Sequence, residues 1–435
     1  MKKLLFATAI AFAAISGNKV MAQEEALNPL DTLATAVQKM QNDLDVLKRL
    51  QFSGYIQGQY QVAESAGEST FEGGNFPTNV DKRFTLRRAR LKATYSTELS
   101  QFVFQIDATE RGVFIRDLYA KFTEPYLKAF SLTAGCMNRP FGFEVPYSSS
   151  LRESPERGRM SQTIFPGERD LGAMITFQMP KTSKWNILKV EGGFFNGTGL
   201  GATDFDSYKD FIGNIGIART TKNEKISYAV RASYYNGGVN QNSSTVYSMG
   251  TDSLGANVFK MNKDTSNFGA AAKRVYTGFD AQLNIDGKFG MTSLRAEFIA
   301  GEQPGTSATS TSPSAQPTEF YKRKFNGAYF YLLQNIGQSK HQFVLKYDWY
   351  DPNTQIKGDE IGQAVAPISG SSFKTTNATD VKFTTIGIGW VYHYDNNLKL
   401  TAFVDFVNNE TTKNVSAYKE DLKDDVFTLR LQYKF

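Results

Sequence analysis

The C-terminal segment is the feature that most constrains the fold of this chain. Residues 425–435 read DVFTLRLQYKF, in which apolar side chains alternate with mostly polar ones. In an extended strand this alternation places all the large apolar side chains on one face, namely Phe427, Leu429, Leu431, Tyr433 and Phe435. A strand with one apolar face and one mostly polar face is the repeating unit of a membrane barrel. The segment therefore predicts an all-β fold.

The same period of two begins at Gln51 and continues to the end of the chain. Sixteen segments follow it, near residues 51–62, 83–96, 101–110, 113–122, 130–137, 171–179, 185–195, 211–219, 226–235, 273–285, 289–301, 325–336, 341–350, 382–394, 398–407 and 425–435. Barrels of bacterial outer membranes have an even number of antiparallel strands. We therefore predict a transmembrane antiparallel 16-stranded β-barrel over residues 51–435.

The connections between these segments alternate in length. Every second one is short, at 97–100, 123–129, 180–184, 220–225, 286–288, 337–340 and 395–397. The others are mostly much longer, at 63–82, 138–170, 236–272, 302–324, 351–381 and 408–424, and only 111–112 departs from the rule. Outer-membrane barrels place short turns on the periplasmic side and long loops outside. A soluble β-sandwich has no reason to produce this alternation.

The N-terminus predicts export. Lys2 and Lys3 precede an apolar run, and Ala22 ends the small-residue pattern that signal peptidase needs, so residues 1–22 are predicted to be a signal peptide cleaved after Ala22. The run is shorter than the ~20 apolar residues of a spanning helix. The predicted localisation is the bacterial outer membrane, with its lipid as the surrounding partner. The small positive net charge gives no argument for nucleic acid as a partner.

Between the signal peptide and the barrel, residues 28–50 carry a helical pattern. Asn28 and Pro29 are suited to a helix start. Apolar residues then recur at alternating spacings of three and four, namely Leu30, Leu33, Val37, Met40, Leu44 and Leu47. This is the seam of a coiled coil. Because a helix of this length is marginal alone in water, we predict a short periplasmic α-helical coiled coil between three barrels. An amphipathic helix packed on its own barrel is the alternative.

Basic side chains outnumber acidic ones about two to one on the strand face assigned to the lumen. A positive lumen lowers the barrier for anions. The densest basic group is Arg87, Arg88, Arg90 and Lys92. The apolar positions switch from even to odd numbers at Arg87 and Arg88, and a β-bulge there would turn both arginines to the lumen, where guanidinium groups can bind oxyanions with paired hydrogen bonds. An arginine pair at the headgroups is the alternative.

The connection 138–170 is the second candidate region. It follows the fifth strand, the position from which general porins fold a loop into the barrel. Its basic residues are Arg139, Arg152, Arg157, Arg159 and Arg169, and its acidic residues are Glu144, Glu153, Glu156, Glu168 and Asp170, so its net charge is zero. Such a loop can set up a transverse field without favouring one sign of ion. Anion selectivity does not follow from the loop alone.

Three short motifs resemble a known family. Arg87 to Leu91 on the second strand, Gly135 with Arg139 to Gly142 after the fifth, and Arg169 to Gly172 entering the sixth are similar to the phosphate-selective porin O and P family, in its Bacteroidetes-type version with an N-terminal coiled coil. A chain that ends on the aromatic residue of its last strand also resembles bacterial outer-membrane proteins. The acidic residues of the connection 138–170 depart from the family's pattern.

The resemblance implies a homotrimer of sixteen-stranded barrels, in which arginines form a constriction in each pore and lysines guide anions towards it. By match of motif, Arg87 and Arg88 would be the strand arginines of the constriction. Arg139 or a later arginine of the same loop would face them.

An enzyme is the main alternative class, and the sequence disfavours it. Outer-membrane hydrolases need a histidine beside a nucleophile or an acid, whereas His341 and His393 are both expected near the inner rim. With Cys136 as the only cysteine, no transition-metal spacing is present, and no metal or cofactor is predicted. The predicted function is an outer-membrane porin for passive diffusion of small anions such as phosphate. A general, weakly selective porin and an adhesin or structural barrel are the alternatives.

Overall fold

The computed structural model describes residues 29–364 and 372–435. The described chain divides between Lys48 and Arg49 into two units. The predicted signal peptide, its cleavage after Ala22 and the helix start at Asn28 lie outside the described residues. Among the helices of the described ranges, none is both long enough and apolar enough to cross a membrane.

The first unit contains one long helix, α1 (Pro29–Arg49), which agrees with the helix predicted over 28–50. The apolar residues of its predicted seam are exposed, namely Leu33, Val37, Met40, Leu44 and Leu47. An apolar stripe of this kind is what a coiled-coil partner would cover.

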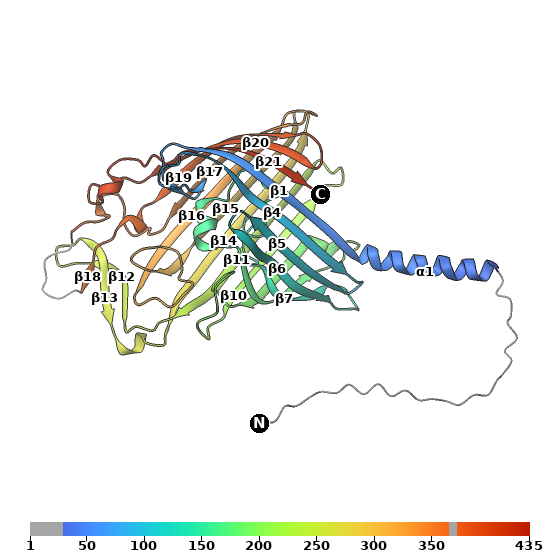
Figure 1. The fold of residues 1–435 in the computed structure, drawn as a ribbon. Coiled ribbons are helices and arrows are strands. Elements are labelled where there is room, and N and C mark those ends of the chain that lie inside the picture. Colours follow the sequence, from blue (N-terminus) through green and yellow to red (C-terminus); the bar gives the residue numbers. More distant parts are fainter. Residues whose placement is uncertain (1–28, 365–371) are drawn as a thin grey trace, which may run out of the picture. The chain divides into compact units, whose positions relative to one another are not determined.

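The second unit is a closed antiparallel barrel of sixteen strands (Figure 1). Its wall runs through β1 (Leu50–Ala63), β4 (Lys82–Ser96), β5 (Ser100–Thr109), β6 (Gly112–Thr123), β7 (Phe130–Asn138), β8 (Arg169–Gln178), β9 (Leu188–Phe195), β10 (Asp210–Thr220), β11 (Ile226–Asn240), β14 (Ala271–Gly287), β15 (Gly290–Gly305), β16 (Phe320–Asn335), β17 (His341–Asp351), β19 (Phe383–His393), β20 (Leu398–Asn409) and β21 (Val426–Lys434). β1 pairs with β4 on one side and with β21 on the other, which closes the wall. All sixteen predicted strands are therefore confirmed.

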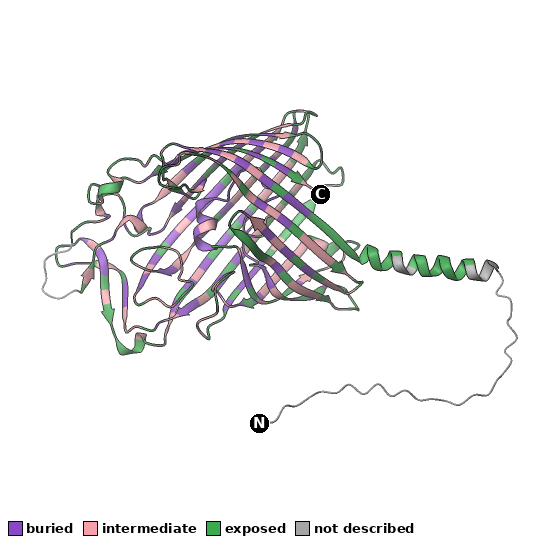
Figure 2. Ribbon diagram, viewed as in Figure 1, coloured by how far each residue is buried: buried purple, intermediate pink, exposed green. Residues whose placement is uncertain are grey.

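The alternation of the predicted faces is confirmed as well (Figure 2). In β21, Thr428, Arg430 and Gln432 are buried inside the barrel, whereas Leu429 and Leu431 are exposed on its outer surface. Polar and charged side chains thus line the interior, while apolar side chains cover the outside, as a barrel in lipid requires.

The long connections hold more structure than the sequence predicted. β2 (Ser69–Thr70) and β3 (Gly74–Asn75) form a small hairpin, and β18 (Phe373–Lys374) is a further short strand. β12 (Thr245–Thr251) and β13 (Asn257–Lys263) form a hairpin in the connection predicted as a loop over 236–272, and β12 pairs in parallel with β16. This pairing buries Val246 against Phe320. The strands β11, β14, β15 and β16 also extend beyond their predicted ends towards this hairpin.

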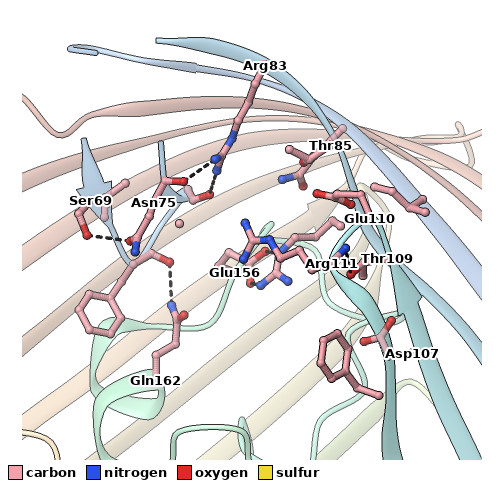
Figure 3. A pocket seen from close by; sticks show the side chains of 18 of the residues that line it. Ser69, Asn75, Arg83, Thr85, Asp107, Thr109, Glu110, Arg111, Glu156 and Gln162 are labelled. Atoms are coloured by element: carbon pink, nitrogen blue, oxygen red, sulfur yellow. Dashed lines mark hydrogen bonds and ion pairs between the residues drawn. The ribbon is translucent and has the colours of Figure 1, made fainter. Parts of the chain in front are cut away.

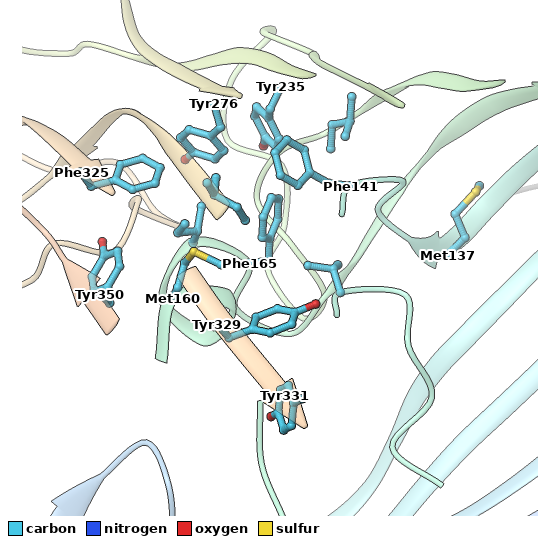
Figure 4. Close-up of a cluster of buried hydrophobic side chains, with 14 of the residues drawn as sticks. Met137, Phe141, Met160, Phe165, Tyr235, Tyr276, Phe325, Tyr329, Tyr331 and Tyr350 are labelled. Carbon is cyan, nitrogen blue, oxygen red and sulfur yellow. The ribbon is translucent and has the colours of Figure 1, made fainter. Parts of the chain in front are cut away.

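The connection 139–168 lies inside the barrel and includes the short helix α2 (Arg159–Ile164). Its buried apolar side chains, Phe141, Met160 and Phe165, pack against Tyr235 on β11 and Tyr276 on β14 (Figure 4). Glycine makes room for this contact, because a Cβ at residue 278 on β14 would lie 2.7 Å from the ring of Phe141.

This apolar core continues along the wall from β15 to β20 through Ile299, Phe325, Tyr329, Tyr331, Val344, Tyr350, Val391 and Phe403. Three of the cavities that flank the loop are lined instead from β1, β4 to β9, β11 and β21. The fold therefore fills one side of the lumen with a packed core and leaves the water-filled space beside the remaining wall.

Candidate functional site

Two β-bulges shape the open side of the lumen. On β4, Gln57 of β1 pairs with Arg88 while the next residue, Gly58, pairs with Leu86, so Arg87 is an extra residue in the strand. The bulge predicted at Arg87 and Arg88 is confirmed. Because a bulged residue interrupts the alternation of faces, both arginines reach the same glutamate inside the barrel.

The second bulge lies on β6 and was missed by the sequence reasoning. Gln105 of β5 pairs with Asp117 while Ile106 pairs with Ile115, so Arg116 is the extra residue. The sequence holds a partial signal for it, because Val113 and Ile115 are odd-numbered whereas Leu118 and Phe122 are even-numbered, although the exposed ring of Phe114 obscures the switch. This is the same switch of parity that revealed the bulge at Arg87.

Glu156 of the inserted loop joins three arginines from two strands. Its carboxylate lies 2.7 Å from Arg87 Nε, 2.9 Å from Arg88 Nη2 and 3.0 Å from Arg430 Nη2. Burial would raise the pKa of Glu156, but the three guanidinium groups outweigh burial and hold that pKa well below its usual range. We call these four residues the Glu156 cluster. The carboxylate is therefore ionised across the physiological range.

Glu168, at the end of the same loop, forms a matching arrangement. It pairs with Arg116 at 2.5 Å, with Arg169 at 3.0 Å and with Arg157, and Asp117 binds Arg169 Nε at 2.7 Å. Burial raises the pKa of Glu168, but the arginines again hold it well below its usual range. These five residues are the Glu168 cluster.

Glu168 adopts a left-handed backbone conformation with a φ of 59°. This conformation costs a non-glycine residue of order 1–3 kcal/mol. The ion pairs of Glu168 with its three arginines are consistent with a surrounding structure that maintains this conformation and fixes the position of the Glu168 carboxylate.

The two clusters carry a surplus of positive charge. Six arginines share ion pairs with Glu156, Glu168 and Asp117, and these are the only carboxylates paired with them among the described residues. Three positive charges are left over, even though the loop as a whole is neutral. Between the clusters Arg90 pairs with Asp107 at 2.9 Å.

The other predicted loop residues lie elsewhere. Arg139 pairs with Asp170 at 3.1 Å and takes no part in either cluster. Arg159 lies over the ring of Phe383 with its guanidinium carbon 3.7 Å from the ring centroid. Arg152 is buried, and within the described ranges its guanidinium nitrogens have no hydrogen-bond partner; burial and nearby arginines lower its pKa.

Of the nine predicted site residues, the structure thus brings Arg87, Arg88, Arg157 and Arg169 into the two clusters. It adds Arg116 and Arg430, which the site prediction omitted. Arg430 is buried on the lumen face of β21, but its partner Glu156 is 274 residues away in the sequence, and no local pattern connects the two.

The clusters separate two chambers. The chamber at the long-loop end has a volume of about 610 Å³ and is lined by Arg83, Arg87, Arg111 and Arg116 with Asp107, Glu110 and Glu156 (Figure 3). Its charges are nearly balanced. Arg83 also donates to the backbone carbonyls of Gly73 and Asn75, which fixes the β2–β3 hairpin beside this chamber.

The chamber at the short-turn end is strongly basic. It comprises two adjoining cavities of about 540 and 360 Å³, which share Lys92, Asp117 and Tyr147. Among the residues that the structure describes, Asp117 and Glu191 are its only acidic lining residues, against nine basic ones: Arg90, Lys92, Lys121, Arg139, Arg157, Arg169, Lys189, Arg231 and Lys434.

Solved structures with the same fold are outer-membrane proteins. The trimer form of OmpT of Vibrio cholerae shares 9% identity with a TM-score of 0.50, over 89% of this chain and 99% of that one. The outer membrane channel DcaP of Acinetobacter baumannii shares 12% identity with a TM-score of 0.50, over 89% and 97%. An anion-selective porin from Comamonas acidovorans shares 10% identity with a TM-score of 0.50, over 89% and 99%. At these identities the likeness shows the fold alone.

A search of curated proteins gave no match. The sequence model of one family, described as phosphate-selective porin O and P, matches residues 67–435, which is most of the chain. That match agrees with the sixteen-stranded wall, the polar lumen and the inserted loop. The protein is an outer-membrane channel and not an enzyme, and it belongs to the phosphate-selective porin O and P family.

Proposed function

We propose that this porin carries small anions by passive diffusion and favours phosphate-type oxyanions. The observation that carries the proposal is the surplus of three positive charges where the two arginine clusters separate the chambers. Fixed positive charge at a narrow passage lowers the barrier for anions and raises it for cations.

The roles of the individual residues follow from their positions. The lysines and arginines of the short-turn chamber raise the local concentration of anions. Arg87, with 39% of its side chain exposed, and Arg116 face the long-loop chamber, so they are the guanidinium groups that an anion from that side meets first. Arg90, Arg157 and Arg169 face the other chamber.

The bound glutamates keep the binding of an anion weak. Each arginine of the clusters already has a carboxylate partner, so an entering oxyanion exchanges with Glu156 or Glu168 and does not fill an empty site. Conduction requires binding that is favourable enough for entry and weak enough for release. The same pairing supports the second candidate, a general porin of weak selectivity.

We further propose that the porin is a homotrimer whose three α1 helices form a periplasmic coiled coil, and that export removes residues 1–22. The exposed apolar stripe of α1 supports the coiled coil. The trimer form of the similar structure of OmpT is consistent with this assembly.

Planar-bilayer recording tests the proposal. In a gradient of potassium chloride, the wild type is expected to show an anion-selective reversal potential and a chloride current that phosphate blocks. The double variant Arg87→Ala/Arg88→Ala should lose roughly a factor of five or more in anion preference, because each unit charge near the ion contributes about 1 kcal/mol in a water-like medium.

Lys413→Ala is the matched control, since Lys413 lies on an outer loop with 85% of its side chain exposed. It should behave as the wild type. Unchanged selectivity in the double variant would overturn the role of the arginines, and a pore that never conducts would favour the adhesin or structural barrel.

A further inference from the structure

The loop exposes an apolar ridge inside the water-filled lumen. Phe141 and Val145 point into the packed core and are fully buried, whereas Phe143, Pro146 and Tyr147 line the short-turn chamber. Leu151 follows them with half of its surface exposed. Because the core is complete without the side chains of this ridge, core packing does not explain their position. Exposed apolar patches commonly mark binding surfaces.

Two side chains of the ridge form an aromatic platform. The rings of Phe143 and Tyr147 are stacked, with centroids 4.8 Å apart and planes 29° apart. The guanidinium carbon of Arg295 lies 5.5 Å from the first ring centroid and 5.0 Å from the second, and Glu153 holds Arg295 in place at 2.8 Å. The rings are therefore supported from the wall.

Unpaired cations line the same chamber. Lys92 and Lys121 line the larger cavity together with Phe143 and Tyr147, and Lys92 and Lys434 line the smaller one. None of these three lysines forms an ion pair within residues 29–364 and 372–435. A plain inorganic anion would use only the lysines, whereas a solute with a flat ring beside its charge would use both features.

We propose that the short-turn chamber binds aryl anions, with the aromatic ring on the platform of Phe143 and Tyr147 and the carboxylate or phosphate group on Lys92 and Lys121. Stacking on the rings and charge attraction by the lysines act on different parts of the solute. The inference rests on the proposed anion pore, through which the solute reaches the chamber, and it extends the solute class beyond small inorganic ions.

Block of the chloride current by benzoate, cyclohexanecarboxylate and acetate tests this inference on the wild-type porin. The three probes carry the same charge, but benzoate has an aromatic ring, cyclohexanecarboxylate a saturated ring and acetate only a methyl group. Benzoate is expected to block at a concentration roughly ten-fold lower than acetate, with cyclohexanecarboxylate between them. Phenyl phosphate compared with benzoate distinguishes an aryl phosphate from an aryl carboxylate as the preferred solute. Equal block by benzoate and acetate would overturn the inference.

Variants locate the site. Phe143→Leu/Tyr147→Leu keeps the apolar volume and should raise the blocking concentration of benzoate roughly ten-fold while that of acetate stays constant. Lys92→Gln/Lys121→Gln should weaken block by both probes. Phe114→Leu is the control, because Phe114 is an exposed ring of the long-loop chamber. If the leucine variant is blocked by benzoate as the wild type is, the platform has no such role.

Chloride conductance and reversal potential without any probe are measured first for every protein. A wild-type pore that does not prefer anions would refute the proposed function. An anion-selective pore that benzoate and acetate block equally would refute only this inference.

Discussion

At the scale of single residues, two glutamates and not the arginines alone set the charge of the two clusters. Glu156 and Glu168 each hold three guanidinium groups, and they reduce the positive charge that a passing anion meets. Truncating one partner of a buried ion pair leaves the other charge uncompensated. Here the uncompensated charge is positive and stands at the proposed constriction.

Glu156→Gln is therefore expected to increase anion selectivity. The substitution keeps the side-chain shape and removes one negative charge, which should raise the permeability of chloride relative to potassium up to roughly five-fold. Reversal potentials in a salt gradient measure the change. Glu98→Gln removes a carboxylate that is 78% exposed on a short turn and should have no effect. A shift towards cations in Glu156→Gln would contradict the role assigned to the cluster.

The sequence revealed some of these residues and not others, for physical reasons. The parity switch at Arg87 is local, so it predicted the bulge correctly. Arg116 carries the same kind of signal, but the strand was treated as a regular alternation. Arg430 and Glu156 come together only because the loop folds back across the barrel. Long-range ion pairs of this kind leave no trace in local periodicity.

At the scale of elements, the inserted loop is the part that occupies the lumen of the barrel. The strands around it were predictable from the alternation of apolar and polar residues. The hairpin β12–β13 was not predicted, because its short strands lie in a long polar connection without a clear period of two. The apolar core of the loop, with Phe141 and Phe165, was also missed. Inside a membrane barrel an apolar core is unexpected, because the period of two predicts a polar lumen.

Phe141→Ala is expected to loosen this loop while the barrel wall stays folded. Removing a buried phenylalanine costs about 3–5 kcal/mol, and the contact with Gly278 and Phe165 would be lost. Single-channel conductance should rise and become noisier. Phe141→Leu keeps most of the volume and should resemble the wild type. A conductance that is identical in all three proteins would show that the core does not hold the loop.

The ion pairs of Glu156 and Glu168 should persist over a wide range of pH. Because the folded-state pKa values of Glu156 and Glu168 lie well below the usual 4.5, their contribution to stability is present above pH 4.5 and is lost only as the pH falls through the depressed values. The difference in reversal potential between the wild type and Glu156→Gln, which reports the contribution of the Glu156 charge, is expected to be constant from about pH 8 to about pH 5. A steep change of this difference within that range would mean that Glu156 titrates there and that the arginines do not hold its pKa down.

At the scale of the whole molecule, fold class and strand number follow from the sequence because both are repeated signals. Each of the sixteen strands shows the alternation of apolar and polar residues, and each short turn indicates an antiparallel neighbour. A wrong assignment of single residues therefore does not change the predicted fold class or strand number. The seam of α1 is a repeated signal too, but only three heptads long. Its proposed partner is the same helix in another copy of the chain, which no single sequence displays.

The coiled coil gives the prediction that belongs to this scale. Leu33→Ser/Met40→Ser/Leu44→Ser removes apolar side chains that are 61%, 59% and 52% exposed in the single chain. Each buried apolar side chain in the seam would contribute about 1.5–3 kcal/mol, so the trimer of the variant should dissociate in detergent at a clearly lower temperature, while its barrels stay folded by circular dichroism. Gln38→Ser/Gln41→Ser/Asp45→Ser changes helix positions outside the seam and should dissociate as the wild type does. If both variants dissociate alike, the apolar stripe does not join the three copies, and contacts between the barrels must hold the trimer by themselves.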